Sequence, residues 1–278
     1  MRFCFGLLVL CTFLIPTSVA AQTSPDQASL QGSPASAPPA APEQSSRARA
    51  VPAFDRPVSW KLMLPNILSD QKHIWTFPSR LAHGHDWLPT VVVLGTTGGL
   101  FALDPIEGNY FRRTSSYHEF NNIFSSTHTS IGLIVAPASF YAVGLLRKDE
   151  KAQHTALLAG EAVADAEILA TVLKDATKRV RPSAFAPRGN LYDSWFESKG
   201  SPLRSNGGFP SGHSIAAFSI ATVVARRYGN HRWVPYAAYG AAALVGFSRL
   251  SLSAHFASDV FLGGALGYSI SRFTVLQQ

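Results

Sequence analysis

Six long apolar segments follow one another along most of this chain, and they constrain its fold more than any other feature. They are too long for ordinary strands and lack two-residue alternation, so we predict that each forms a helix. Glycine and alanine recur at close spacing within them, which lets packed helices approach closely. The sequence therefore predicts an all-α fold, a bundle of about six core helices. The segments are residues 88–103, 130–146, 155–173, 214–225, 234–247 and 260–276.

The segments leave open whether this bundle is soluble or embedded in a membrane. Most are shorter than the ~20 apolar residues that a membrane-spanning helix needs. Segment 155–173 also carries Glu161, Asp165 and Glu167, which would be costly in contact with lipid.

Other features favour a membrane. The connectors 147–151 and 226–232 are basic, as cytoplasmic loops of membrane proteins are. Segment 88–103 is the weakest candidate span because glycines interrupt it. The residues before it, 69–81, could lie along a membrane surface or form a solvated amphipathic helix.

The N-terminal part of the chain differs from the rest in composition. One arginine, a short apolar run and then small residues have the form of a cleaved secretory signal peptide, which we predict at 1–21. An uncleaved membrane anchor is the other interpretation. Residues 22–54 are rich in proline, alanine and serine, so we predict a disordered linker. One helical domain then covers 55–278.

Cysteine and charge narrow the class of protein further. Cys4 and Cys11 both lie in the predicted signal peptide, so the exported chain would have no disulfide, thiolate metal site or cysteine nucleophile. Export without cysteine fits a bacterial periplasm or envelope. The net charge of +7 favours phosphorylated substrates or an anionic membrane surface. Basic runs interleaved with aromatic residues do not occur, so we expect no nucleic-acid partner.

The first polar cluster is KDATKRVRP, residues 174–182. Lys174 and Arg181 are seven positions apart, which places both on one face of a helix. Pro182 should end that helix at Arg181, because it disfavours helical geometry in the preceding residue. Cations are favoured at any helix C-terminus, so this cluster alone is also consistent with an ordinary helix end.

The second cluster, PSGH at 210–213, directly precedes the fourth apolar segment. Ser211 is a good N-cap for that helix, and Gly212 permits a backbone turn that other residues resist. Free N–H groups at a helix N-terminus bind anions, so a phosphate could lie here beside His213. Taken alone, the cluster could equally be a simple cap.

The third cluster is SRLSLSAHFASD, residues 248–259. His255 and Asp259 are four positions apart, so on a helix the carboxylate can hold one imidazole nitrogen and leave the other free. Arg249 lies just upstream. An ordinary surface pair at a helix entrance would show the same spacing.

Each cluster lies at the end of a long apolar helix, and antiparallel packing of consecutive helices brings such ends to one face of a bundle. Together they supply three cations, a helix N-terminus, two histidines and one carboxylate. That set suits phosphoryl transfer. Cations and amides stabilise charge on the phosphoryl oxygens, one histidine attacks phosphorus, and the other protonates the leaving oxygen.

The three motifs, K-x6-R-P, P-S-G-H and S-R-x5-H-x3-D, resemble the signature motifs of the type 2 phosphatidic acid phosphatase and vanadium haloperoxidase superfamily. All three are complete and in order, with a signature core over residues 130–275 of the domain at 55–278. The resemblance is to the phosphatase branch, and it implies an all-α bundle.

The resemblance also implies a role for each motif residue. His255 would be the nucleophile that forms a phosphohistidine, Asp259 would orient it, and His213 would be the general acid. No metal or other cofactor is implied for phosphatase work. The phosphoryl oxygens would be held by Lys174, Arg181, Ser211, Gly212 and Arg249.

The expected function is thus metal-independent hydrolysis of phosphate monoesters or diphosphates, with a lipid or isoprenoid phosphate as the substrate hypothesis. Three alternatives stay open: a soluble periplasmic non-specific acid phosphatase, a vanadium-dependent haloperoxidase holding vanadate in the same pocket, and a non-catalytic envelope protein that binds phosphate. The expected location is the bacterial cell envelope, either periplasmic or in the inner membrane with the site facing the periplasm.

The connector 183–209 is long for a loop and lies next to the expected site. Its aromatic residues could contact a lipid chain and its cations a second phosphate, although a solvated loop fits the same pattern. The residues concerned are Tyr192, Trp195, Phe196, Arg188, Lys199 and Arg204.

Overall fold

The computed structural model describes residues 56–186, 189–198 and 207–276, and within them helices are the only regular structure. The predicted signal peptide and linker lie outside these residues. The elements are α1 (Met63–Trp75), α2 (Phe77–Ala82), α3 (Trp87–Arg113), α4 (His118–Ile123), α5 (Ser126–Arg147), α6 (Glu150–Thr177), η1 (Pro182–Ala184), α7 (Gly212–Arg227), α8 (Trp233–Ser251), α9 (Ala257–Ile270) and η2 (Ser271–Val275).

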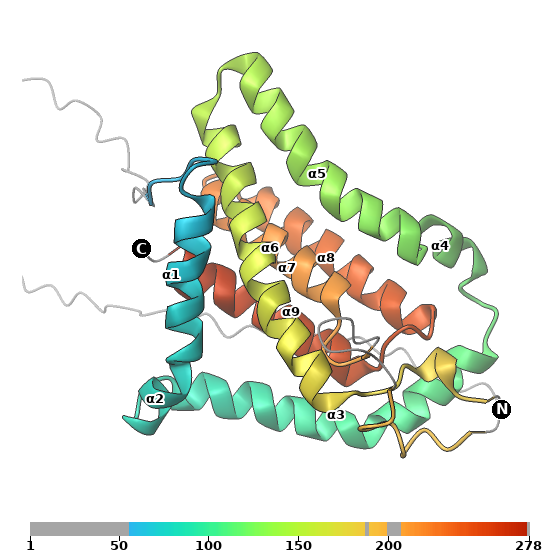
Figure 1. Ribbon diagram of the computed structural model, residues 1–278. Coiled ribbons are helices and arrows are strands. Elements are labelled where there is room, and N and C mark those ends of the chain that lie inside the picture. The colour runs from blue at the N-terminus through green and yellow to red at the C-terminus, as the bar shows by residue number, and fades with distance from the viewer. Residues whose placement is uncertain (1–55, 187–188, 199–206, 277–278) are drawn as a thin grey trace, which may run out of the picture. The chain divides into compact units, whose positions relative to one another are not determined.

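The all-α prediction is confirmed, and each of the six apolar segments forms a helix. In chain order the segments are parts of α3, α5, α6, α7, α8 and α9, the last continuing into the π-helical turn η2 (Figure 1). All except α9 are longer than the apolar run that predicted them, because polar turns at their ends are also helical.

Helix α7 is the centre of the packing and contacts α6, α8 and α9. Its Ile215 and Val223 are completely buried, and alanines of α6, including Ala162 and Ala166, are buried in the same cluster. Small side chains on α6 allow this close approach. The N-terminus of α7 is thereby held in a fixed place at one end of the bundle.

Two glycines of α9 bring its backbone against α7. A Cβ atom on Gly263 would lie 2.7 Å from the carbonyl oxygen of Ser211, and one on Gly267 would clash with the carbonyl of Ile215. The closely spaced small residues therefore let the helices approach closely, as predicted. This contact also places the start of α7 beside the start of α9, where the third motif ends.

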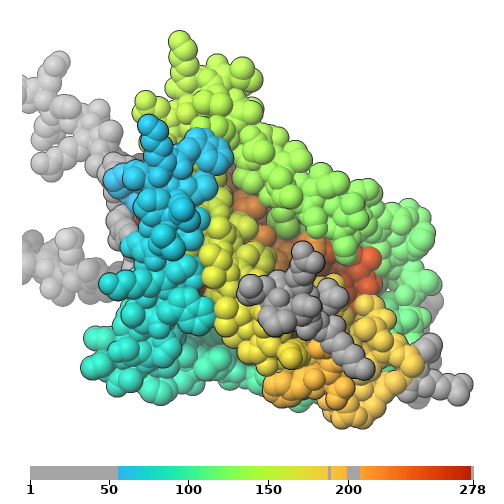
Figure 2. All heavy atoms as spheres, viewed as in Figure 1, coloured from blue at the N-terminus to red at the C-terminus, as the bar shows by residue number. Residues whose placement is uncertain are grey.

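Helix α1 covers one side of α6 (Figure 2). Asn66 donates a hydrogen bond to Glu161 Oε1 at 2.9 Å, and Gln71 donates one to Asp165 Oδ1 at 2.9 Å. Both carboxylates are completely buried. Two of the three acidic residues of segment 155–173 are therefore hydrogen-bonded within the protein. Helix α1, which makes these hydrogen bonds, includes the first part of the segment 69–81.

Two helices are long and apolar enough to cross a membrane, judged by length and composition alone among the described residues: α3, with mean hydropathy 1.3, and α5, with 1.7. Both are largely exposed along their length. Segment 88–103, the weakest candidate in the sequence, belongs to the 27-residue α3. In Figure 1, α3 passes across the end of the bundle where α6 ends.

The two basic connectors meet at the other end of the bundle. Lys151 Nζ lies 4.4 Å from the centre of the Tyr228 ring, which joins the start of α6 to the end of α7. The opposite ends of these two helices carry the first and second motifs. The bundle therefore has a basic connector end and a motif end.

Candidate active site

The structure brings the three motifs together at one end of the bundle, as predicted. They occupy the end of α6, the start of α7 and the turn between α8 and α9. His213 and Arg249 both contact Ser126. The Gly208 carbonyl meets His255, and a Cβ on Gly208 would lie 3.4 Å from Arg181 Cγ and 3.5 Å from Asp259 Oδ2. The spatial convergence on which the phosphoryl-transfer interpretation depends is present.

His255 is held so that one imidazole nitrogen carries a lone pair. Its Nδ1 lies 2.7 Å from the carbonyl oxygen of Gly208, which can only accept a hydrogen bond, so Nδ1 carries the proton and Nε2 does not. Burial lowers the pKa of His255 from its ordinary value, Asp259 raises it, and the Arg181 charge lowers it. The net lowering favours the neutral imidazole, which is the form that can act as a nucleophile.

The predicted His255–Asp259 pair differs in detail. Helix α9 begins at Ala257, so His255 precedes the helix and the two do not share a helix face. Asp259 Oδ2 accepts a hydrogen bond from the backbone of Phe256 at 2.8 Å and lies 3.7 Å from His255 Nδ1. The short contact to the imidazole therefore comes from Gly208, and Asp259 supplies a charge behind it.

His213 is the second residue of α7 and is directed toward α5. Its Nε2 lies 2.9 Å from Ser130 Oγ. Ser130 donates its own proton to the carbonyl of Ser126 at 2.8 Å, so it accepts from His213 Nε2. Burial first, and then the charge of Arg249, lower the pKa of His213 to about 4.

Ser211 caps α7 as predicted, since its Oγ accepts from the backbone of Ser214 at 3.4 Å. The reason predicted for Gly212 is wrong, because its φ is not in the left-handed region. A Cβ there would lie 2.8 Å from Glu167 Oε1 and 3.0 Å from Lys174 Nζ, so a larger residue would displace the ends of these two side chains. The start of α7 thus packs directly on the side chains near the end of α6.

The shared helix face predicted for the first motif is also wrong. Helix α6 ends at Thr177, and Lys178 follows with a left-handed φ of 43°. Arg181 is extended, with ψ at 149°, as expected for a residue before proline. Lys174 lies on α6, where Glu167 Oε2 is 3.6 Å from its Nζ, whereas Arg181 reaches the site from the connector.

Arg249 is completely buried and joins two helices. From the last turn of α8 it donates to the Phe124 carbonyl at 2.7 Å, to Thr129 Oγ1 at 3.0 Å and to Ser126 Oγ at 3.2 Å. These acceptors lie at the start of α5. Arg249 therefore fixes α5 against the site, beside the serine and carbonyl that His213 meets.

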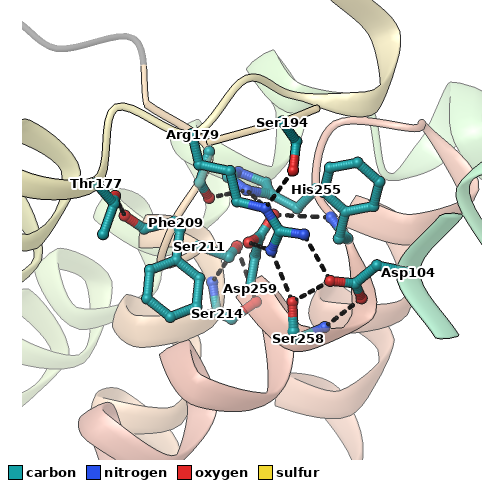
Figure 3. Close-up of polar contacts among 12 residues, drawn as sticks. Asp104, Thr177, Arg179, Ser194, Phe209, Ser211, Ser214, His255, Ser258 and Asp259 are labelled. Carbon is teal, nitrogen blue, oxygen red and sulfur yellow. Dashed lines mark hydrogen bonds and ion pairs between the residues drawn. The ribbon is translucent and has the colours of Figure 1, made fainter. Parts of the chain in front are cut away.

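A residue that the sequence interpretation missed, Arg179, forms the hydrogen-bonded hub of this end of the bundle (Figure 3). Its guanidinium donates to Asp259 Oδ1 at 2.6 Å, to Asp104 Oδ2 at 2.6 Å and to Ser258 Oγ at 2.7 Å. Arg179 and Asp104 are almost completely buried. The carboxylate that faces His255 is thus tied to a second carboxylate on α3.

Two sequence signals could have identified this hub. Arg179 lies two positions before Arg181 within the first motif. Asp104 directly follows the apolar segment 88–103, and a carboxylate in an apolar helix usually faces the protein interior and is paired. Neither signal says which residues pair, because the partners are far apart in sequence.

Aromatic rings enclose the hub, and Trp195 of the connector is one of them. The guanidinium carbon of Arg179 lies 4.4 Å from the centre of the Trp195 ring and 4.3 Å from that of Phe256. Trp195 is therefore part of the site's support. Tyr192 and Phe196 are exposed. Arg188, Lys199 and Arg204 lie outside the described residues.

An apolar cavity of about 390 Å³ lies between α5, α7 and α8, next to this site. Phe124 and Thr129, which accept hydrogen bonds from Arg249, line one part of it. Small residues line much of the remainder and include Gly132, Ala136, Ala217, Ala221 and Ala242. Among the described residues, no group of three or more His, Cys, Asp or Glu side chains is arranged to hold a metal ion.

The fold and the site together define a class: an all-α protein whose helix ends gather two histidines, several cations and a helix N-terminus at one end of the bundle. Residues 155–278 match the model of the PAP2 superfamily. This matched region covers less than half of the chain and contains all three motifs.

Two similar proteins place the match in context. The chain is 42% identical over 65 residues to a lipid A 1-phosphatase from Porphyromonas gingivalis, a stretch that covers 23% of this chain and 15% of that relative. A transmembrane PAP2-type phosphatidylglycerolphosphate phosphatase from Bacillus subtilis is 22% identical, with a TM-score of 0.38, over 76% of this chain and 94% of the other.

Proposed function

We propose that this chain is a phosphatase that hydrolyses phosphorylated lipids or isoprenoids through a phosphohistidine. One observation carries the proposal: His255 donates from Nδ1 to the Gly208 carbonyl, which leaves the Nε2 lone pair available within a group of cations. A site that only bound phosphate would gain nothing from a neutral imidazole held in this tautomer. The match of residues 155–278 to the PAP2 superfamily supports the same reaction.

In the proposed first step, the Nε2 lone pair of His255 forms a bond to phosphorus while the bond from phosphorus to the leaving oxygen breaks. The leaving oxygen takes its proton from His213. Water then attacks the phosphohistidine and gives a proton to His213, the P–N bond breaks, and inorganic phosphate leaves. Asp259 stabilises the positive charge that His255 acquires during transfer.

His213 must be protonated to act as the general acid, and the negative charge of the bound substrate favours that protonation. Without an anion, burial and the nearby arginines keep the pKa of His213 at about 4, so it is neutral near pH 7. A bound phosphate places negative charge beside it, which favours the protonated form. Lys174, Arg181, Arg249, the Ser211 hydroxyl and the Gly212 amide would hold the phosphoryl oxygens.

A lipid substrate is supported by the surroundings of the site. The apolar cavity between α5, α7 and α8 has the size of a ligand pocket and adjoins Arg249 through Phe124 and Thr129. The helices α3 and α5 expose apolar side chains along their length, which suits a membrane-associated protein. We place the motif end toward the periplasm and the basic connectors toward the cytoplasm, in an exported chain that needs no metal.

The experiment compares phosphate release by the wild-type protein and by His255→Ala in detergent or nanodiscs. We expect the variant to lose turnover by on the order of a thousandfold or more, because it lacks the attacking group. His83→Ala, a change at an exposed histidine that follows α2, is the matched control and should keep full activity. Full activity in His255→Ala would overturn the proposed mechanism.

Substrate choice and chemistry are tested in the same preparation. Radiolabelled phosphate should be trapped on the wild type after an alkaline quench and be absent from His255→Ala. Long-chain lipid phosphates should be better substrates than small soluble esters, and the reverse order would indicate a non-specific acid phosphatase. Halide oxidation with added vanadate would indicate a haloperoxidase, and phosphate binding without turnover would indicate a binding protein.

A further inference from the structure

We propose that Asp104 of α3, acting through Arg179, is a positioning residue that sets the place and charge of Asp259 behind His255. The proposal rests on the proposed phosphatase function. It assigns a role in the site to a residue that lies before the matched region 155–278. It also explains why a carboxylate is buried in an apolar helix.

Almost all N–H groups of the Arg179 guanidinium donate hydrogen bonds to neighbouring side chains. Its Nη1 donates to Asp259 Oδ1 at 2.6 Å and to Ser258 Oγ at 2.7 Å. Its Nη2 donates to Asp104 Oδ2 at 2.6 Å, and its Nε donates to Ser194 Oγ at 3.2 Å. Four of the five N–H donors of an arginine are therefore occupied in a buried setting. Such a group has little freedom to move.

Asp104 is held just as firmly to the first turn of α9. Its Oδ1 accepts from the backbone of Ser258 at 3.1 Å, and its Oδ2 accepts from Ser258 Oγ at 2.5 Å. Gly108, one turn later on α3, has no side chain and so leaves room for the Phe256 ring, since a Cβ there would lie 3.0 Å from it. Helix α3 thus packs against Phe256 and Ser258, the residues just before Asp259.

Sharing Arg179 between two carboxylates determines what Asp259 can do. An arginine facing a single carboxylate tends to bind both of its oxygens in a bidentate pair. Because Asp104 occupies Nη2, Arg179 gives Asp259 only Nη1, on Oδ1. Asp259 Oδ2 is left toward the Phe256 amide and His255. Asp104 therefore keeps the charge of Asp259 directed at the nucleophile.

The same sharing sets the net charge near His255. Asp104 and Asp259 together balance Arg179 and leave one negative charge for the imidazole and the phosphate-binding cations. Removing Asp104 makes this surrounding more positive, and removing the charge of Arg179 makes it more negative. The charged and titratable groups that face His255 from the packed elements are Arg181, His213, Arg249, Asp259, Arg179, Asp104 and Glu107.

The test measures kcat and KM across pH for Asp104→Asn, with Asp70→Asn as the matched control. Asp70 is an equally buried aspartate that also pairs with a buried arginine at 2.6 Å, but on α1. We expect Asp104→Asn to lower kcat by on the order of ten- to a hundredfold with little change in KM, because the orienting carboxylate is misplaced. Asp70→Asn should leave both unchanged in the folded protein.

The pH profile separates positioning from loss of stability. The acidic limb of kcat/KM, which reports the free enzyme, should move to lower pH in Asp104→Asn by about half a unit, because added positive charge disfavours the imidazolium of His255. In Arg179→Gln the limb should move to higher pH. An unmoved limb and unchanged kcat in folded Asp104→Asn would overturn the proposal.

A second variant tests the proposal if Asp104→Asn is unstable, and the activity of the wild type tests the phosphatase function itself. If Asp104→Asn does not fold, Ser258→Ala, which removes the hydroxyl joining Asp104 to Arg179, should lower kcat several-fold at constant KM, and wild-type kcat in this variant would overturn the proposal. A wild-type protein that is inactive on all phosphate esters would instead overturn the phosphatase function.

Discussion

Two buried arginine–aspartate pairs in this protein have nearly the same local chemistry and very different surroundings. Arg56 and Asp70 meet at 2.6 Å between the segment before α1 and α1 itself, and Arg179 and Asp104 meet at 2.6 Å between the end of α6 and α3. All four side chains are almost inaccessible to solvent. The first pair joins α1 to the segment that precedes it. The second pair contacts Asp259, which faces the proposed nucleophile His255.

The two arginines differ in how completely their nitrogens are paired. In the described part of the chain, Arg56 Nη2 is buried without a hydrogen-bond partner. Each Arg179 nitrogen donates to at least one oxygen in that same part, although both carboxylate oxygens of the neighbouring Glu107 lack a partner there. A guanidinium whose nitrogens are all paired has one defined position, whereas a partly paired one tolerates adjustment. The difference suggests that the geometry of the Arg179 network matters for function and that of the Arg56 network matters for stability alone.

The largest effect is expected from removing either arginine. Arg179→Met and Arg56→Met each leave buried carboxylates without a counter-charge, so each should lower the free energy of unfolding by about 3–5 kcal/mol. Only Arg179→Met should abolish turnover per folded molecule. Thermal unfolding in detergent, together with activity corrected for the folded fraction, checks this. Equal activity loss in both variants would erase the distinction between the networks.

Replacing a whole network with apolar residues sharpens the comparison. The triple change Arg56→Met, Asp70→Leu and Glu161→Leu should destabilise the protein less than Arg56→Met alone, because the paired charges leave together, although Asn66 and the buried Asp165 each lose a neighbour. Phosphate release should stay at the wild-type level.

The corresponding triple change at the site should separate stability from function. Arg179→Met, Asp104→Leu and Asp259→Leu together should recover much of the stability lost in Arg179→Met, for the same reason. Turnover should not return, because the carboxylate behind His255 is gone. Recovery of activity in this variant would show that the Arg179 network is only structural.

The site region should also make stability depend on pH. Burial lowers the pKa of His213 from 6.5 to about 4, so the unfolded chain binds more protons between these values and stability rises with pH there. Unfolding midpoints against pH for the wild type and His213→Gln should show the loss of this slope in the variant; parallel curves would contradict this.

The smallest effect is expected at the more exposed Lys174–Glu167 pair, where the atoms are 3.6 Å apart. Glu167→Gln should change the free energy of unfolding by less than about 0.5 kcal/mol, because solvent screens such pairs. Because Glu167→Gln removes the negative charge beside Lys174, it should tighten the binding of vanadate, a phosphate analogue, by a few-fold. Calorimetric titration measures this, and weaker binding would show that Glu167 positions Lys174.

Much of the fold followed from the sequence because helix formation here is local. The six apolar segments became helices at the predicted places, and Ser211 became an N-cap. Arg181 is extended because Pro182 follows it. Helix ends were less predictable: α6 stops at Thr177, four residues before Arg181, because Lys178 adopts a left-handed conformation that the motif spacing does not encode.

The sequence by itself determined which chemical groups could act, since the histidines, cations and carboxylate of the motifs do gather at one end of the bundle. Only the tertiary structure decided how they are held. His255 takes its hydrogen-bond partner from Gly208, 47 residues away, and Arg179 takes Asp104, 75 residues away. Such contacts depend on where packed helices place their ends, and local spacing carries no information about that.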